Sequence, residues 1–178
     1  MGLPELTPKE LFPVMKQMVL DTYKVESHFF SDPYDSFDIL DMGFRKMVWG
    51  AYSTNPDLVF SMMKDHPYQI VVVESSLHFH NIVVLFGQSS SPDFISFGPF
   101  CTETASAMTI SKIMKDNQIS PKYFAFIQQF YLGLPIVNID DFITTVRHFI
   151  MSFIPTFENC PPVNKRNEFD TPAASPAV

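Results

Sequence analysis

The stretch Phe94-Ile95-Ser96-Phe97-Gly98-Pro99-Phe100 decides the fold of this chain. It follows two other apolar runs, residues 69–74 and 78–86, and all three have the length and the Val- and Phe-rich composition of β-strands. The connections between them are short, so we expect the three strands to pair antiparallel. Gly98 and Pro99 should end the third strand, because glycine frees the backbone torsion φ and proline lacks a ladder donor.

Helical periodicity precedes this β centre. Thr7, Pro8 and Glu10 have the spacing of a capped helix start, and Pro13 should kink that helix or delay its beginning. Residues 23–30 then predict a short strand near an edge of the sheet.

A second helix is expected between the edge strand and the β centre, with its caps at Asp35 and Ser36 and its apolar face running through Val48. Asp41 lies four residues before Arg45, the spacing of a helical ion pair worth about 0.3 kcal/mol. A shorter helix is expected over residues 55–67.

Helical periodicity also follows the β centre. We expect one helix from Thr102 to Met114, a second that begins at Ser120-Pro121, and a last one capped by Asn138. The apolar stripe of the last helix has two compatible uses, packing on the sheet and forming a dimer that passes a signal outward. Its expected signal-output residues are Phe142, Val146, Phe149, Ile150 and Phe153.

The pattern as a whole predicts an α+β domain over residues 1–157, with a small, mainly antiparallel sheet flanked by helices in the manner of PAS or GAF sensor domains. Residues 158–178 are rich in proline and poor in apolar side chains, so we expect a disordered tail or linker there.

Composition narrows the class of protein. The chain has 178 residues, 12 basic and 19 acidic, with a formal net charge of −7 and no basic stripe, so we expect it to bind nucleic acid poorly by itself. Its two cysteines, Cys101 and Cys160, fit a reducing cytoplasm without a structural disulfide. We see no targeting signal and no apolar run near the ~20 residues of a spanning helix, and therefore expect a soluble cytoplasmic protein.

Two sets of residues are candidates for chemistry. His78 and His80 alternate on one strand face close to Glu74, a pattern that can hold a metal, but no third ligand is suitably spaced. We therefore expect neither a metal nor another cofactor. Cys101 could act as a nucleophile if the fold brought it to His78 or His80, and a buried, unreactive cysteine is the alternative.

The aromatic side chains suggest a second kind of site, since ligand pockets are mostly apolar. A cleft between sheet and helices and a filled aromatic core explain the same residues. The candidate ligand-binding residues are Phe79, Phe86, Phe97, Tyr123, Phe126 and Phe130, with Phe94 beside them.

A resemblance joins several of these stretches. Phe97-Gly98-Pro99-Phe100, directly after a strand, resembles the "(I/F)GP(F/Y)" element in the N-terminal sensor domains of Firmicutes transcriptional regulators of the AraC type. Four other stretches resemble elements of the same domains in the same order, so that the resemblance spans residues 8–157. They are residues 37–46, Glu74-Ser75 with 78–80, Leu134-Pro135-Ile136-Val137 and Ser152-Phe153-Ile154-Pro155.

The resemblance implies a sensory and regulatory domain that binds a small-molecule effector or a partner and forms a homodimer. It implies contact with DNA only through a helix-turn-helix domain, which this sequence does not contain. Two alternatives stay open: a small enzyme that uses Cys101 with His78 or His80, and a structural dimerisation module.

Overall fold

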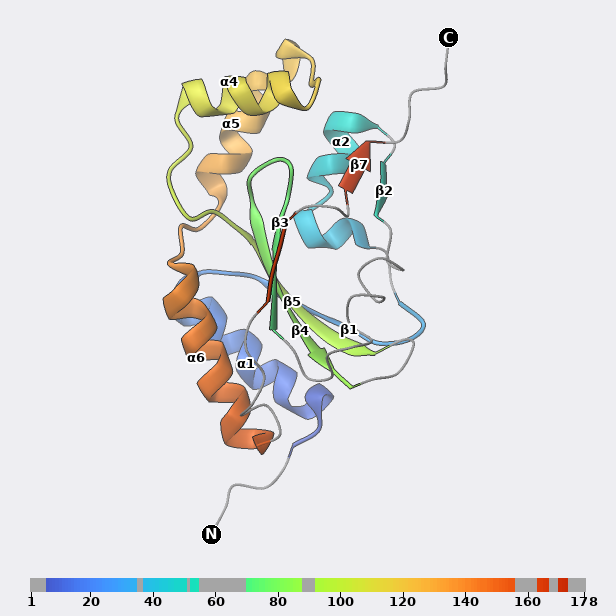
Figure 1. Cartoon of the computed structure of the whole chain (residues 1–178), viewed down its shortest axis with the longest axis vertical. Coiled ribbons are helices and arrows are strands. Elements are labelled where there is room, and N and C mark those ends of the chain that lie inside the picture. The colour runs from blue at the N-terminus through green and yellow to red at the C-terminus, as the bar shows by residue number, and fades with distance from the viewer. Residues whose placement is uncertain are drawn as a thin grey trace.

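A computed structural model describes residues 6–34, 37–50, 52–54, 70–87, 92–155, 163–166 and 170–172. The described part is an α+β fold in which helices flank a mainly antiparallel sheet (Figure 1), as the sequence predicts. The sheet has the strand order β1-β5-β4-β3-β6. These strands are β1 (Ser27–Phe30), β3 (Ile70–Glu74), β4 (His80–Phe86), β5 (Asp93–Phe100) and β6 (Val163–Arg166).

The three central strands pair as predicted, with β4 antiparallel to both β3 and β5. β1 pairs antiparallel with β5 and lies at an edge, which confirms the edge strand expected within residues 23–30. β6 pairs parallel with β3 at the other edge. A separate two-stranded ladder joins β2 (Tyr52–Thr54) to β7 (Asp170–Pro172).

The C-terminal segment differs from the prediction. Disorder was expected for residues 158–178, but residues 163–166 and 170–172 form β6 and β7. Composition missed these strands because ladder hydrogen bonds join backbone groups, and the outer edge of β3 offers such groups to any extended segment. The domain boundary at residue 157 stays a prediction.

Two helices cover one face of the sheet. α1 (Pro8–Tyr23) and α6 (Ile139–Phe153) run side by side in Figure 1, and the Tyr23 hydroxyl lies 2.7 Å from Thr145 Oγ1. Both predicted N-caps are confirmed, a Thr7–Glu10 capping box and an Asn138 side chain that accepts the Asp141 N–H. Pro13 lies inside α1 without delaying its start. The core beneath these helices includes Leu11, Met15, Val19, Ile70, Val72, Ile82, Val84, Ile95, Phe97, Phe142, Val146 and Ile150.

A short 3₁₀ helix, η1 (Phe37–Asp41), packs on the opposite face of the sheet, followed by α2 (Phe44–Trp49). The sequence predicted one helix here. The chain instead takes left-handed backbone at Met42 (φ 57°) and Gly43 (φ 76°), which separates the two elements. The side chains packed on this face are Phe30, Tyr34, Phe37, Leu40, Val71, Val73, Val83, Leu85 and Phe94.

A third group of helices surrounds the tip of the β3–β4 hairpin (Figure 1). It consists of α2, α4 (Ala107–Asp116), η2 (Pro121–Tyr123) and α5 (Phe124–Gly133). The Asn117 Nδ2 donates to the Ser76 carbonyl at 3.1 Å, and the Tyr131 hydroxyl donates to the Leu77 carbonyl. These bonds fix the hairpin tip between the helices.

One predicted helix starts later than expected, and another lies outside the described residues. The helix expected from Thr102 begins later, at Ala107, because Ser106 caps it by accepting the Thr109 N–H. The helix expected over residues 55–67 lies outside the described residues. Within the described ranges, none of the helices combines the length and apolar character that crossing a bilayer requires.

Gly98-Pro99 does not end β5, so that part of the prediction is wrong. The ladder continues to Phe100 through a register shift, with Phe97 opposite Ile82 and Phe100 opposite His80. Two residues of β5 therefore face one residue of β4, as in a β-bulge. Gly98 has φ +144°, and a Cβ built there would lie 2.5 Å from Asn81 Nδ2 and 2.8 Å from the His80 carbonyl oxygen. The predicted intolerance of a side chain at this position has a physical cause in this crowding.

We expect Gly98→Val to lower the free energy of unfolding by about 1–3 kcal/mol more than Gly87→Val. Gly87 also has a positive φ, +108°, but nothing lies within 4 Å of a Cβ built there. The pair therefore separates crowding from backbone strain. Urea denaturation of both variants measures the difference, and equal losses would show that Asn81 yields without cost.

Candidate functional site

Asn81 lies in β4 opposite the bulge, and its side chain fills the space that Gly98 leaves open. Its Nδ2 donates to the Leu40 carbonyl at 3.1 Å and to Ser96 Oγ at 3.3 Å. Ser96 lies in β5 and is buried, whereas Leu40 belongs to η1. Asn81 thus connects the helical cover of this face to two central strands.

On the other face, the same bulge contacts α6. Phe97 and Phe100 flank Gly98-Pro99, and the ring of Phe142 meets both edge to face, with centroids 5.8 Å and 5.7 Å apart. All three rings are fully buried. Edge-to-face pairs of this kind contribute about 0.5–1.5 kcal/mol beyond their burial. One short segment of β5 is therefore packed against η1 through Asn81 and against α6 through Phe142.

Asp41 and Arg45 form the predicted ion pair, but in a different setting. Both side chains are buried, and the Arg45 Nε lies 2.5 Å from Asp41 Oδ2. The same carboxylate accepts the backbone N–H groups of Gly43 and Arg45, each at 3.0 Å. The pair joins η1 to α2 across the left-handed turn instead of lying on one exposed helix. It orders the corner that places Leu40 above Asn81.

The histidines at the hairpin do not share one strand face. His78 lies in the turn with φ 61°, and β4 begins only at His80. The His78 Nδ1 lies 3.8 Å from Glu74 Oε1, whereas the His80 ring stacks on Phe100 with centroids 5.7 Å apart. Burial lowers the pKa of His80, which favours the neutral form of its imidazole.

The described residues around these histidines do not provide the ligands that a metal ion needs. Across the described residues, no three His, Cys, Asp or Glu side chains gather closely enough to hold a metal ion. The absence of a metal in the protein stays a prediction.

Cys101 is a buried residue in a backbone junction. Its N–H donates to the Pro135 carbonyl at 2.9 Å, and its carbonyl accepts the Val137 N–H at 2.8 Å. The thiol packs within the cluster at the hairpin tip, where burial raises its pKa to about 11. Because the thiolate is the nucleophile, this environment opposes the activation that a catalytic cysteine needs.

The candidate ligand-binding aromatics do not line one cleft. Phe86 and Phe97 belong to the core beneath α1 and α6, whereas Phe79, Tyr123 and Phe130 pack at the hairpin tip. Phe94 lies on the η1 face, and Phe126 is 38% exposed. Most of these rings serve as core in three separate clusters.

The ring of Phe44, a residue within the helix that the sequence predicts between Ser36 and Val48, lies at the centre of the hairpin-tip cluster. This ring stacks on Phe130 with centroids 3.9 Å apart, and it meets Phe79 edge to face at 6.1 Å. These contacts join α2, α5 and the hairpin. Helical periodicity indicates that Phe44 is inward-facing but cannot identify partners from distant segments.

The stripe of α6 divides into two parts. Phe142, Val146 and Ile150 have no exposed surface and pack in the core. Phe149 and Phe153 are half-buried, with their rings 5.3 Å apart. Phe142, Val146 and Ile150 therefore pack on the sheet. Of the five stripe residues, only Phe149 and Phe153 keep exposed surface that a second copy of the chain could contact.

A hollow that the sequence did not suggest lies between α4 and the η2–α5 segment. It has a volume of about 410 Å³ and is lined by Ser111, Met114, Lys115, Ile119, Pro121 and Phe124. Helical spacing places the three α4 residues on one face, but only the tertiary structure places the other three opposite them.

Comparisons of the chain with models of known protein families, with curated proteins and with solved structures gave no match.

We expect Asp41→Ala to lower the free energy of unfolding by about 3 kcal/mol, because it removes the carboxylate from a buried ion pair and from two backbone donors. Lys46→Ala, in α2, is the matched control, because it removes the exposed ion pair that joins α2 to η1 at the same corner. Its ammonium pairs with Asp38 at 3.3 Å, but the Lys46 side chain is 64% exposed, so we expect a loss below about 1 kcal/mol. Urea denaturation measures both. A loss at Asp41 no larger than that at Lys46 would show that the buried pair does not hold the corner.

Cys101 should react slowly with iodoacetamide in the folded protein. With a pKa of about 11, only about one thiol in a thousand is a thiolate at pH 8. A raised pKa moves thiolate formation to higher pH, so the labelling rate should still be rising above pH 9. Mass spectrometry of the Cys101 peptide, in buffer and in denaturing urea, measures the rate. Faster labelling in the folded state would instead indicate an activated thiol.

Proposed function

We propose that this chain is a sensory and regulatory domain of the kind found at the N-terminus of AraC-type transcriptional regulators. In this proposal, a change on the sheet face beneath η1 passes through β4 and β5 to α6. The observation that carries it is the bulge at Gly98, which is packed against η1 through Asn81 on one face and against α6 through Phe142 on the other.

The strand order supports the finer proposal of a PAS/GAF-like domain. β1, the first strand of the sheet in sequence, lies beside β5, the last of three consecutive antiparallel strands. This arrangement leaves one sheet face to η1 and the other to the helices α1 and α6. A cover on one face and an output helix on the other are what a sensor requires.

The state of Cys101 favours the sensor over the enzyme. A nucleophilic cysteine sits in an electropositive, partly exposed environment that lowers its pKa. Here burial does the opposite, with the pKa raised to about 11. We therefore propose no catalytic role for Cys101, His78 or His80.

The proposed output runs through α6 to a partner. Phe149 and Phe153 are the half-buried part of its stripe, and we propose them as the contact for a homodimer. DNA would be reached through a helix-turn-helix domain and not by these residues, since the outward side of α6 mixes Asp140 and Asp141 with Arg147 and His148.

Hydrogen exchange of α6 tests the proposal with Asn81→Ala and Val83→Ala. Both residues lie on the η1 face of β4, but Asn81 fills the space at Gly98, whereas Val83 packs with the apolar cluster of that face. We expect Asn81→Ala to raise exchange of residues 142–150 about fivefold more than Val83→Ala, relative to α4, because a lost hydrogen bond is worth about 1 kcal/mol.

Normalising to α4 removes a general loss of stability that both variants share. If α6 exchanges alike in the two variants, the bulge does not transmit between the faces and the proposed route to α6 is wrong.

A further inference from the structure

The hollow between α4 and the η2–α5 segment has the size of a small-molecule site. Its volume of about 410 Å³ lies within the usual range for ligand pockets. Met114 and Ile119 are buried and form its apolar floor, and the half-buried Phe124 forms a wall. Ser111 and Lys115 bring a hydroxyl and an ammonium-bearing side chain to an otherwise apolar surface.

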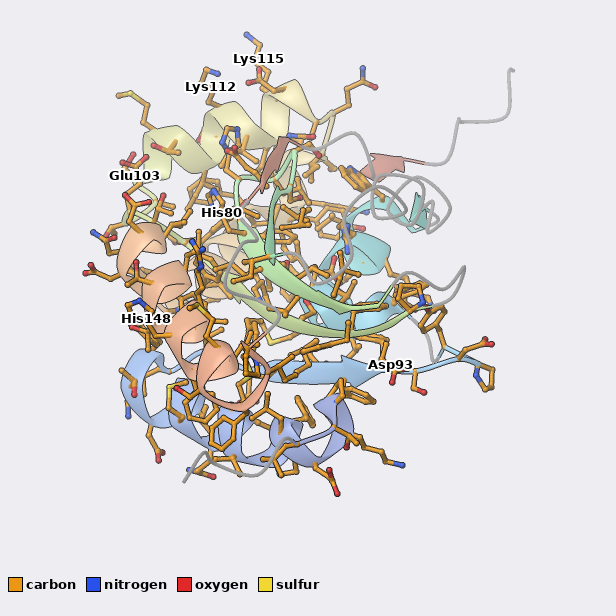
Figure 2. All side chains as sticks on the ribbon, turned by 60° about the horizontal axis from the view of Figure 1, so that its bottom comes forward. His80, Asp93, Glu103, Lys112, Lys115 and His148 are labelled. Atoms are coloured by element: carbon orange, nitrogen blue, oxygen red, sulfur yellow. The ribbon has the colours of Figure 1, made fainter. Side chains whose placement is uncertain are left out.

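The charge around the hollow is opposite to that of the whole chain. Residues 105–137 contain three lysines and one aspartate, in a protein with a net charge of −7. Lys112 pairs with Asp116 at 3.0 Å, and Lys122 lies over the Tyr123 ring at 5.0 Å. Lys115 is among the residues that line the hollow, and Figure 2 shows the side chains of Lys112 and Lys115 extending from α4 into solvent. The excess positive charge attracts anions to this part of the surface.

We propose that this hollow binds a small amphipathic carboxylate with an aryl or short alkyl body. The apolar body would lie on Met114, Ile119 and Phe124, where it loses contact with water. The carboxylate would lie at the rim, where the Lys115 ammonium and the Ser111 hydroxyl donate to it. An uncharged ligand of the same shape would keep the first contact and lose the second.

The hollow is connected to the β3–β4 hairpin. Asn117 follows α4 directly, and its Nδ2 donates both to the Ile113 carbonyl at 2.9 Å and to the Ser76 carbonyl at 3.1 Å. The Ile119 N–H donates to the Met114 carbonyl at 2.8 Å, which ties the floor of the hollow to the same corner. A ligand that spreads α4 from α5 would therefore move the hairpin tip.

The proposal that the hollow is an effector site rests on the proposed sensor function. Binding of a carboxylate to the hollow depends only on α4, η2, α5 and the residues that connect them. The two are tested separately: failure of binding leaves the exchange coupling between Asn81 and α6 intact, and failure of that coupling leaves binding intact.

Isothermal titration of the full chain with 3-phenylpropionate, and with 3-phenylpropan-1-ol as its uncharged counterpart, tests the site. We expect the carboxylate to bind at least fivefold more tightly than the alcohol. Nitrogen–proton correlation spectra recorded with the carboxylate should show their largest shifts in residues 111–124.

Lys115→Met keeps the side-chain stem and removes the charge, so it should weaken carboxylate binding roughly fivefold and leave alcohol binding unchanged. Lys112→Met, one turn earlier on α4, removes a lysine that does not line the hollow and should change neither. Ser111→Phe places a ring at the exposed rim and should abolish binding of both ligands without unfolding the chain.

Three results would overturn the proposal. They are the absence of carboxylate binding at millimolar concentration, equal losses in Lys115→Met and Lys112→Met, and shifts confined to residues outside 111–124.

Discussion

The register shift between β4 and β5 is the constraint on which much of the remaining packing depends. In a regular strand, residues three apart point to opposite faces. Phe97 and Phe100 are three apart, yet both pack under α6, because Gly98-Pro99 puts two residues of β5 opposite the single residue Asn81. Without the bulge, only one of the two rings could meet Phe142.

The bulge also explains why a polar side chain lies between the sheet and its cover. The missing Cβ of Gly98 leaves a space that Asn81 fills, and its amide finds partners in Leu40 and Ser96. Leu40 is in reach because η1 ends at Asp41, whose buried carboxylate holds the following turn and Arg45. The half-buried Asn81 amide and the buried Asp41 carboxylate thus fix the cover where apolar packing alone would allow it to slide.

The β3–β4 hairpin unites the two proposals. Its tip is held by Asn117 and Tyr131, from the helices that enclose the hollow, and Asn81 lies near the start of β4. A ligand between α4 and α5 would act on one end of the hairpin, and the bulge that contacts α6 lies a few residues further along. Under the two proposals, the route from effector to output would run along the β3–β4 hairpin to the bulge that β4 forms with β5.

The sequence by itself determined the elements and their local ends. Apolar runs separated by short connections predicted the three central strands, and the spacing of Thr7 to Glu10 and the position of Asn138 predicted two capped helices, because these signals are local. It also predicted that Asp41 and Arg45 would pair.

Only the tertiary structure decided how deeply the individual side chains are buried and which residues they contact. Distant segments must meet to bury the Asp41–Arg45 pair and to divide the aromatic rings among three clusters. They must also meet to bury Phe142, Val146 and Ile150, which removes these residues from any dimer surface. The strands β6 and β7 also depend on distant segments, because their backbone groups pair with β3 and β2 whatever their own side chains are. The physical reason is the same in each case: periodicity records which way a side chain points, whereas its neighbours are set by the other elements that fold against it.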